Sequence, residues 1–233
     1  MSQGTLTTDK GLATLLKTTV TQLQGTAPTS DGLGELIASI NKAIYGFAPA
    51  GSRPSQYLGP TGCIAESMDR ASTTFAYVAV SSGTLYLSAL YLPANTVVSN
   101  LNTVTGSTAS SGVTHNWMCL ADNALSLLAV SADNTTNDLS ASTLQTYAIA
   151  TVAAGAATSF TTTYSGLYYV GFMIATGTTQ PTIQGQTDLA STMMGLAPKL
   201  CGSSNTGATT PPAFPATLTS ITSSASQIYT FVS

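Results

Sequence analysis

Charged side chains are the scarcest feature of this chain of 233 residues, because Asp, Glu, Lys and Arg make up only 6% of it. An ordinary soluble domain carries roughly 25%. The six basic and nine acidic residues give a net charge of −3, and nothing suggests the basic face that binds nucleic acid. We therefore expect no nucleic-acid partner. Apolar residues reach 43%, which is close to normal and sufficient for a sizeable core.

Long apolar runs are missing as well. No window approaches the roughly 18 unbroken apolar residues that a membrane-spanning helix needs. The polar, Thr-rich stretch 1–17 lacks the apolar core of a signal peptide. We accordingly expect a chain that is made in a cytoplasm and that has no membrane partner.

Cysteine is rare, and its spacing carries no metal or redox pattern. The three cysteines, Cys63, Cys119 and Cys201, are far apart, and no C-x-x-C occurs. Cys119 lies in the apolar run 117–120, where a buried thiol acts as a small hydrophobic group. We interpret all three as structural and expect no metal and no cofactor.

The few charges that are present divide the chain. Residues 1–70 hold five of the six basic groups and five of the nine acids, whereas residues 71–233 contain one lysine, four aspartates, no glutamate and no arginine. We predict an N-terminal helical segment at 1–47, a Pro- and Gly-rich linker at 48–70, and a β-rich domain at 71–233.

Leucines and isoleucines recur at helical spacing in the N-terminal segment and predict two helices between residues 8 and 47. Isolated helices of this length are marginal in water, so their apolar stripes must pack against something. An intramolecular helical hairpin and an oligomerisation or docking anchor are both open. The candidate assembly interface consists of Leu12, Leu15, Leu16, Leu33, Leu36, Ile37, Ile40 and Ile44.

From about Thr73 the apolar period changes to two, which predicts strands. A turn at Pro93–Asn95 separates two of them. The predicted strands are 75–80, 85–92, 96–98, 114–121, 125–131, 144–150, 158–164, 167–175 and 226–232. So many short strands predict a mainly β fold, an antiparallel β-sandwich of jelly-roll-like type. Residues 178–215 are less regular, and 202–212 is typical of a long surface loop or arm.

Catalytic candidates are few, because the chain has a single histidine, His115. Counts alone leave a Ser–His–Asp triad open, but the G-x-S-x-G motif of one hydrolase class is absent. The alternation of the strand places His115 and Trp117 on the same face. An ordinary strand histidine is the favoured interpretation, and we predict that the chain is not an enzyme.

Two binding chemistries have candidate residues in the β region. Asp133, Asn134, Asn137 and Asp138 could offer oxygen ligands to calcium, although such residues are equally typical of turns. The G-x-x-x-x-G-K-[ST] and G-x-G-x-x-G phosphate motifs do not occur. Trp117 could stack on a sugar ring, but packing inside a sheet is the commoner role of such a side chain.

Three blocks of the β region, 85–98, 114–133 and 164–171, resemble segments of minor tail and head-decoration proteins of actinobacteriophages, in the same order. The resemblance covers about residues 75–175 and includes no catalytic motif. It implies a β-sandwich that is displayed on a virus particle.

This resemblance and the low charge lead to one expectation. The chain would be a virion structural protein of the capsid-decoration or head-fibre type, assembled in the host cytoplasm. It would bind itself, as a trimer, and other virion proteins such as the major capsid protein. Sparse charge suits permanent, closely packed contacts, where burying charges is costly. The alternatives are a minor tail or tail-tip protein, a carbohydrate-binding module that contacts host-surface glycans, and a hydrolase that uses His115.

Overall fold

A computed structural model describes residues 63–73, 77–187, 189, 197–205 and 209–233. All of them belong to one compact unit of the chain, residues 54–233. The predicted helices between residues 8 and 47, and with them all eight leucines and isoleucines of the candidate assembly interface, lie outside the described residues.

The described residues are mainly β, and every strand pairing among them is antiparallel, so this part of the prediction is confirmed. They contain one short 3-10 helix, η1 (Arg70–Thr73), and no α-helix. No helix in this described part is long and apolar enough to cross a membrane. The strands are β1 Ala65–Glu66, β2 Tyr77–Ala79, β3 Thr84–Leu92, β4 Val97–Val98, β5 Asn100–Val104, β6 Ser111–Asp122, β7 Leu127–Ser131, β8 Leu144–Val152, β9 Gly155–Ala156, β10 Phe160–Thr161, β11 Gly166–Thr179, β12 Thr182–Gln186, β13 Cys201–Ser204, β14 Thr222–Ser223, β15 Gln227–Ile228 and β16 Thr230–Val232.

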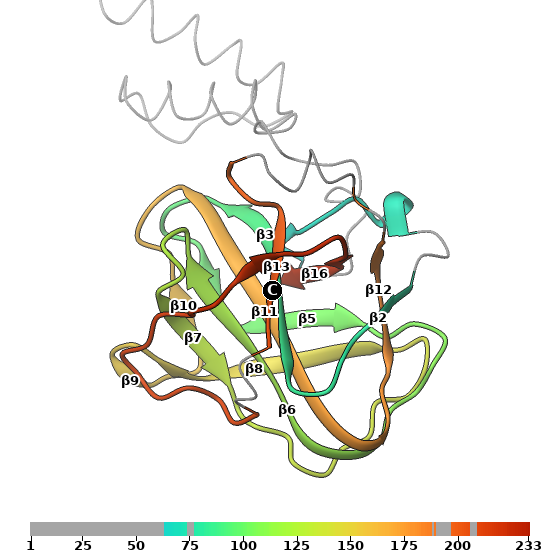
Figure 1. Ribbon diagram of the computed structural model, residues 1–233. Coiled ribbons are helices and arrows are strands. Elements are labelled where there is room, and N and C mark those ends of the chain that lie inside the picture. The colour runs from blue at the N-terminus through green and yellow to red at the C-terminus, as the bar shows by residue number, and fades with distance from the viewer. Residues whose placement is uncertain (1–62, 74–76, 188, 190–196, 206–208) are drawn as a thin grey trace, which may run out of the picture. The chain divides into compact units, whose positions relative to one another are not determined.

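The strands form three sheets. The largest has 11 strands in the order β1-β16-β5-β8-β7-β6-β11-β3-β13-β14, with β9 paired to β8. The smaller sheets are β10-β4 and β15-β12-β2. The long strands β6 and β11 run side by side through the unit (Figure 1), and β11 pairs with β6 on one side and β3 on the other.

Most predicted strands are present, but their boundaries differ. The turn at Pro93–Asn95 is confirmed, and Asn95 takes a left-handed backbone conformation (φ 61°) that asparagine tolerates well. The predicted strand 158–164 shortens to the two residues of β10. The sheet also begins earlier than residue 71, because β1 already pairs with β16.

Besides the two-residue strands β1, β9 and β14, the prediction missed three longer strands, and each is rich in polar or small residues. They are β5, β12 and β13. The prediction of a loop at 202–212 is wrong at its start, because Gly202–Ser204 pairs with β3. Gly202 is needed there, since a Cβ atom would lie 2.6 Å from Ile221 Cγ2 and 2.9 Å from the Thr222 carbonyl oxygen. Backbone pairing, not an apolar pattern, makes these segments strands.

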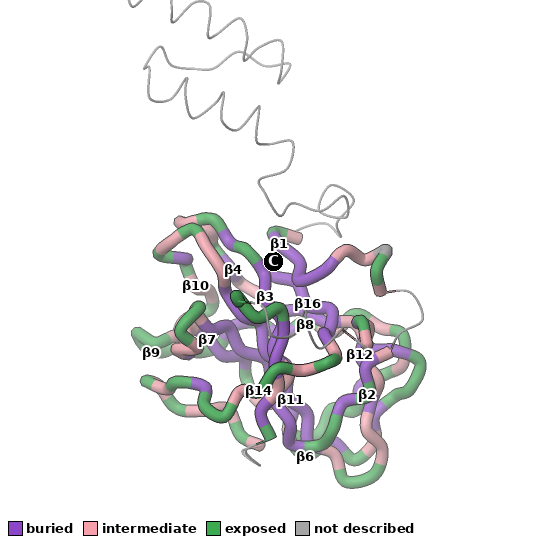
Figure 2. The backbone as a smooth tube through the Cα atoms, turned by 45° about the horizontal axis from the view of Figure 1, so that its top comes forward, coloured by how far each residue is buried: buried purple, intermediate pink, exposed green. Residues whose placement is uncertain are grey.

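The central strands β3, β6 and β11 are buried on both faces, as the burial colouring of Figure 2 shows. Alternate residues of β11 define the two faces. Tyr168, Val170, Phe172 and Ile174 belong to the first face, and Tyr169, Met173 and Ala175 belong to the second face. Both faces therefore need a cover.

Strands cover the first face. Apolar residues of β2, β4, β5, β8, β12, β15 and β16 join the same core as the first-face residues of β3, β6 and β11. Because β5 and β8 also belong to the large sheet, that sheet must turn back on itself. Register shifts between β7 and each of its neighbours occur at the place where it turns, and bulges of this kind bend strands.

The second face is covered by a segment of mostly irregular structure, residues 209–221, which we call the covering segment. Its apolar residues Phe214, Ala216, Leu218 and Ile221 pack on the second core. It is tied to the β6–β7 turn by two backbone bonds: Leu127 N–H donates to the Ala216 carbonyl at 2.8 Å, and Leu218 N–H donates to the Leu125 carbonyl at 2.8 Å.

Candidate functional site

Three aspartates of the β unit, Asp122, Asp133 and Asp138, are engaged in local structure. Asp122 Oδ1 accepts hydrogen bonds from the backbone N–H groups of Ala124 at 2.9 Å and of Ser126 at 2.8 Å, which closes the turn between β6 and β7. Leu125, inside this turn, has φ 65°, an uncommon conformation for a bulky residue. The Asp122 carboxylate thus holds a strained turn beneath the covering segment.

His115 and Asp133 form an ion pair or a hydrogen bond according to the histidine protonation state. His115 Nδ1 lies 2.7 Å from Asp133 Oδ2, and Asp133 Oδ1 accepts the backbone N–H of Asn116 at 3.0 Å. Both side chains are partly exposed. The pair fixes the loop after β7 to strand β6, so the histidine has a structural partner.

The two aspartates among the calcium candidates accept backbone hydrogen bonds. Asp138 Oδ1 accepts the Val113 N–H at 3.1 Å, while Asp133 binds His115 and Asn116. Over the described ranges, no three His, Cys, Asp or Glu side chains come together to hold a metal ion. The two carboxylates fasten the loop to β6 at separate points.

The cysteines are free thiols, and Cys119 and Cys201 are buried. Burial raises the pKa of Cys119 to about 12, and burial together with the nearby Glu66 charge raises the pKa of Cys63 to about 11. The thiolate is the reactive form of cysteine, so both thiols stay neutral at ordinary pH. Cys119 packs in the second core, as the sequence predicts.

One buried acid joins the two ends of the β unit. Glu66, on β1, is 4% exposed, and the Tyr229 hydroxyl donates to its Oε2 at 2.9 Å. Arg70 Nε lies 3.6 Å from the same oxygen. Burial, and then the hydrogen bond to Glu66, raise the pKa of Tyr229. The acid therefore secures β1 beside β16.

Trp117 is not on the surface. Its side chain belongs to the second core at 2% exposure, and its indole N–H donates to the Thr209 carbonyl at 2.7 Å. A platform for sugar stacking needs an exposed ring face, which Trp117 does not present. Its buried indole instead anchors the start of the covering segment.

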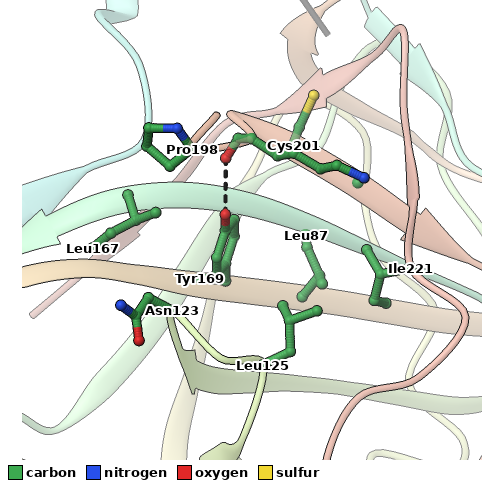
Figure 3. Close-up of a pocket in the computed structure, with 10 residues that line it drawn as sticks. Leu87, Asn123, Leu125, Leu167, Tyr169, Pro198, Cys201 and Ile221 are labelled. Atoms are coloured by element: carbon green, nitrogen blue, oxygen red, sulfur yellow. Dashed lines mark hydrogen bonds between the residues drawn. The ribbon is translucent and has the colours of Figure 1, made fainter. Parts of the chain in front are cut away.

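An apolar hollow of about 520 Å³ lies on the second face, beside the covering segment. Its lining residues come from five separate stretches of the chain (Figure 3). They are Leu87, Asn123, Leu125, Leu167, Tyr169, Pro198, Lys199, Cys201, Gly202 and Ile221. We call this space the second-face cavity.

The second-face cavity has an apolar interior and a polar rim. Leu87 and Tyr169 are buried, whereas Asn123, Pro198 and Lys199 are exposed. The Tyr169 hydroxyl donates to the Lys199 carbonyl at 2.9 Å, and this bond holds the rim to β11 (Figure 3).

The Cys201 thiol is turned away from the cavity interior. In Figure 3 its sulfur points away from Leu87 and Leu125, consistent with its hydrogen bond to the Ser224 carbonyl at 3.2 Å. Sequence reasoning missed this cavity, because its walls come from segments up to 134 positions apart (221 minus 87) and no local pattern links them.

Comparison with known proteins adds no relative. No protein-family model matches the chain, and no curated protein matches it.

Proposed function

We propose that the chain is a non-enzymatic structural protein of a bacteriophage particle, of the capsid-decoration or head-fibre type. In this proposal the β unit is a sandwich of jelly-roll-like type that is displayed on the particle. Residues 1–47 attach it to the particle, to further copies of itself as a trimer, and to proteins such as the major capsid protein.

The observation that carries the proposal is the use of the ionisable groups in the β unit. Asp122, Asp133 and Asp138 each accept backbone N–H groups, and His115 faces Asp133. Catalysis usually depends on ionisable groups with freedom to exchange protons with a substrate. Here these groups fasten turns and loops, which supports a scaffold.

The low charge of the β unit supports the same role. Between residues 71 and 233 the sequence contains one lysine, four aspartates and no arginine or glutamate. Such a surface gives little electrostatic steering of a diffusing partner. It suits lasting contacts inside an assembly, because few charges must lose their water when neighbours pack together.

A minor tail or tail-tip protein is the alternative location, and immunogold labelling of intact particles separates head from tail. A role in binding host-surface glycans is the alternative activity. It would use an exposed aromatic residue such as Tyr91, which is 45% exposed, in place of the buried Trp117. A glycan array with a Tyr91→Ala control tests it.

The central experiment changes the predicted anchor in the full chain. Replacing Leu36 and Ile40 with Asp puts two charges on the apolar stripe and should abolish incorporation into particles while the β unit stays folded. The matched control replaces Val97 and Leu144 with Asp, since both side chains are 52% exposed on the β unit. We expect the control to incorporate at the wild-type level.

Particle incorporation is measured by quantitative mass spectrometry of particles purified from cells infected by the phage that encodes the chain. Urea unfolding of each variant reports whether the β unit remains folded. Wild-type incorporation of the Leu36/Ile40 variant would refute the anchor, and the absence of the unmodified chain from particles would refute the virion role itself.

A further inference from the structure

We infer that the second-face cavity is a binding site for an anionic amphiphile, a molecule with one alkyl chain and a terminal carboxylate. Nothing in the proposed virion role requires such a ligand, so the two proposals stand or fall separately. The alkyl chain would occupy the apolar interior, and the carboxylate would lie at the rim beside Lys199.

The apolar interior of the second-face cavity favours an alkyl chain. Leu87, Leu125, Leu167 and Ile221 and the ring of Tyr169 form the walls around about 520 Å³, within the roughly 300–1,000 Å³ of typical small-molecule sites. The Tyr169 hydroxyl already donates its hydrogen bond to the Lys199 carbonyl. A polar ligand group placed inside would lose its hydrogen bonds to water without replacement, whereas an alkyl chain gains from leaving water.

The rim of the second-face cavity favours a negatively charged ligand group. Lys199 lines the second-face cavity, is exposed, and is the only basic residue between positions 71 and 233. Asn123, another lining residue, adds an exposed amide. No aspartate or glutamate occurs among the described lining residues. In a unit with so little charge, a lone ammonium at the mouth of an apolar cavity is complementary to a single carboxylate.

The cavity exists because of how the second face is covered. The covering segment pairs with the β6–β7 turn at Ser126 and Thr217 through an isolated bridge, and Ile221 reaches the cavity from its end. Leu87 and Tyr169 below it belong to β3 and β11, and each of these strands is paired on both sides. This pairing holds one wall of the cavity in place, which lowers the cost of ordering a site for its ligand.

The first test compares dodecanoate with dodecan-1-ol by isothermal titration calorimetry on the full chain, below the micelle concentration. Lys199→Met should weaken dodecanoate binding about tenfold, a loss of roughly 1.4 kcal/mol, and leave dodecan-1-ol unchanged. Lys199→Arg keeps the charge and should bind dodecanoate within about twofold of wild type. Each methylene removed from the acid should weaken binding roughly fourfold.

The second test locates the alkyl chain. Leu167→Trp fills part of the second-face cavity and should weaken both ligands by about tenfold or more, because Leu167 is a partly buried lining residue. Leu144→Trp is the matched control, since Leu144 is exposed on β8 and lines none of this cavity. Ile221→Phe narrows the same space from the covering segment and serves if Leu167→Trp is unstable in urea.

The outcomes separate clearly. Absence of dodecanoate binding overturns the proposal, as does equal binding by the Leu167→Trp, Ile221→Phe and Leu144→Trp proteins, which would place the ligand elsewhere. Equal loss of acid and alcohol in Lys199→Met overturns the role of the charge. Binding of dodecanoate to a chain that never enters particles would support this site and refute only the virion role.

Discussion

The two faces of the central strands β3, β6 and β11 are both apolar but differently covered. The first face meets other strands and closes into a core that includes the fully buried Phe172 and Leu120. The second face meets the covering segment and retains the second-face cavity. Apolar character alone does not determine how tightly a sheet face is filled.

The reason lies in the backbone of each cover. Strands pair continuously, so their side chains arrive at regular spacing and interdigitate. The covering segment contains Pro211, Pro212 and Pro215, which have no N–H to donate to a ladder. It touches the sheet through a few bonds and separate side chains, and hollows remain between them.

The largest expected effect is on the free energy of unfolding, when a buried leucine is replaced by alanine on one face or on the other. Leu120→Ala on the first face should lower the free energy of unfolding by about 4 kcal/mol, because strands on both sides cannot collapse into the space. Leu87→Ala on the second face should cost about 2–3 kcal/mol, since the covering segment can shift toward the sheet. Both leucines are at most 1% exposed. Urea unfolding measures the pair, and a loss for Leu87→Ala as large as that for Leu120→Ala would contradict the comparison.

A smaller effect concerns alkaline pH and the second core. Because burial raises the pKa of Cys119 from 9.0 to about 12, its neutral thiol favours the folded state fully below pH 9. This stability is lost as the pH rises from 9 toward 12, where the unfolded thiol ionises and the folded one does not. Between pH 8 and 10 the loss for one such group is about 1.4 kcal/mol.

Cys119→Ala should therefore lose about 1.4 kcal/mol less stability than the unmodified chain between pH 8 and 10. For each protein we compare its stability at pH 8 with its stability at pH 10, so the packing cost of the alanine, which is present at both pH values, cancels. Urea midpoints at several pH values supply the measurement. Identical pH dependence in the two proteins would show that Cys119 ionises without unfolding, and that the second face admits water.

The smallest expected effect is that of Asp133→Asn, in the partly exposed pair of His115 and Asp133 at the edge of the second face. Asp133→Asn removes the charge beside His115 but keeps an acceptor for the Asn116 N–H, so it should cost less than about 1 kcal/mol. Asp133→Ala also removes that acceptor and should cost about 1–3 kcal/mol more. Equal urea midpoints for the two variants would show that the backbone bond contributes little.

The strands with an alternating apolar pattern could be predicted from the sequence. Strands β3, β8 and β11 follow such segments, and the turn at Pro93–Asn95 follows its residue types. Strands β5 and β13 could not be predicted in this way, since they consist largely of Asn, Thr, Gly and Ser. Their pairing partners, β8 and β16 for one and β3 and β14 for the other, decide their conformation.

The candidate sites divide in the same manner. His115 and Trp117 stood out because each is the single residue of its type, yet the structure uses one to fasten a loop and buries the other under Thr209. The second-face cavity had no signal, since Leu87, Leu167 and Ile221 are ordinary apolar residues in distant segments.

By itself the sequence determined the antiparallel β character of the described unit and its scarcity of charge, because residue type and local alternation act over a few neighbouring positions. Only the tertiary structure decided which face strands would cover and which would be left to residues 209–221. That choice depends on packing between segments more than one hundred residues apart, such as those of Leu87 and Ile221, which belong to the same core. This covering of the second face leaves a cavity beside Lys199, which no local sequence pattern predicts.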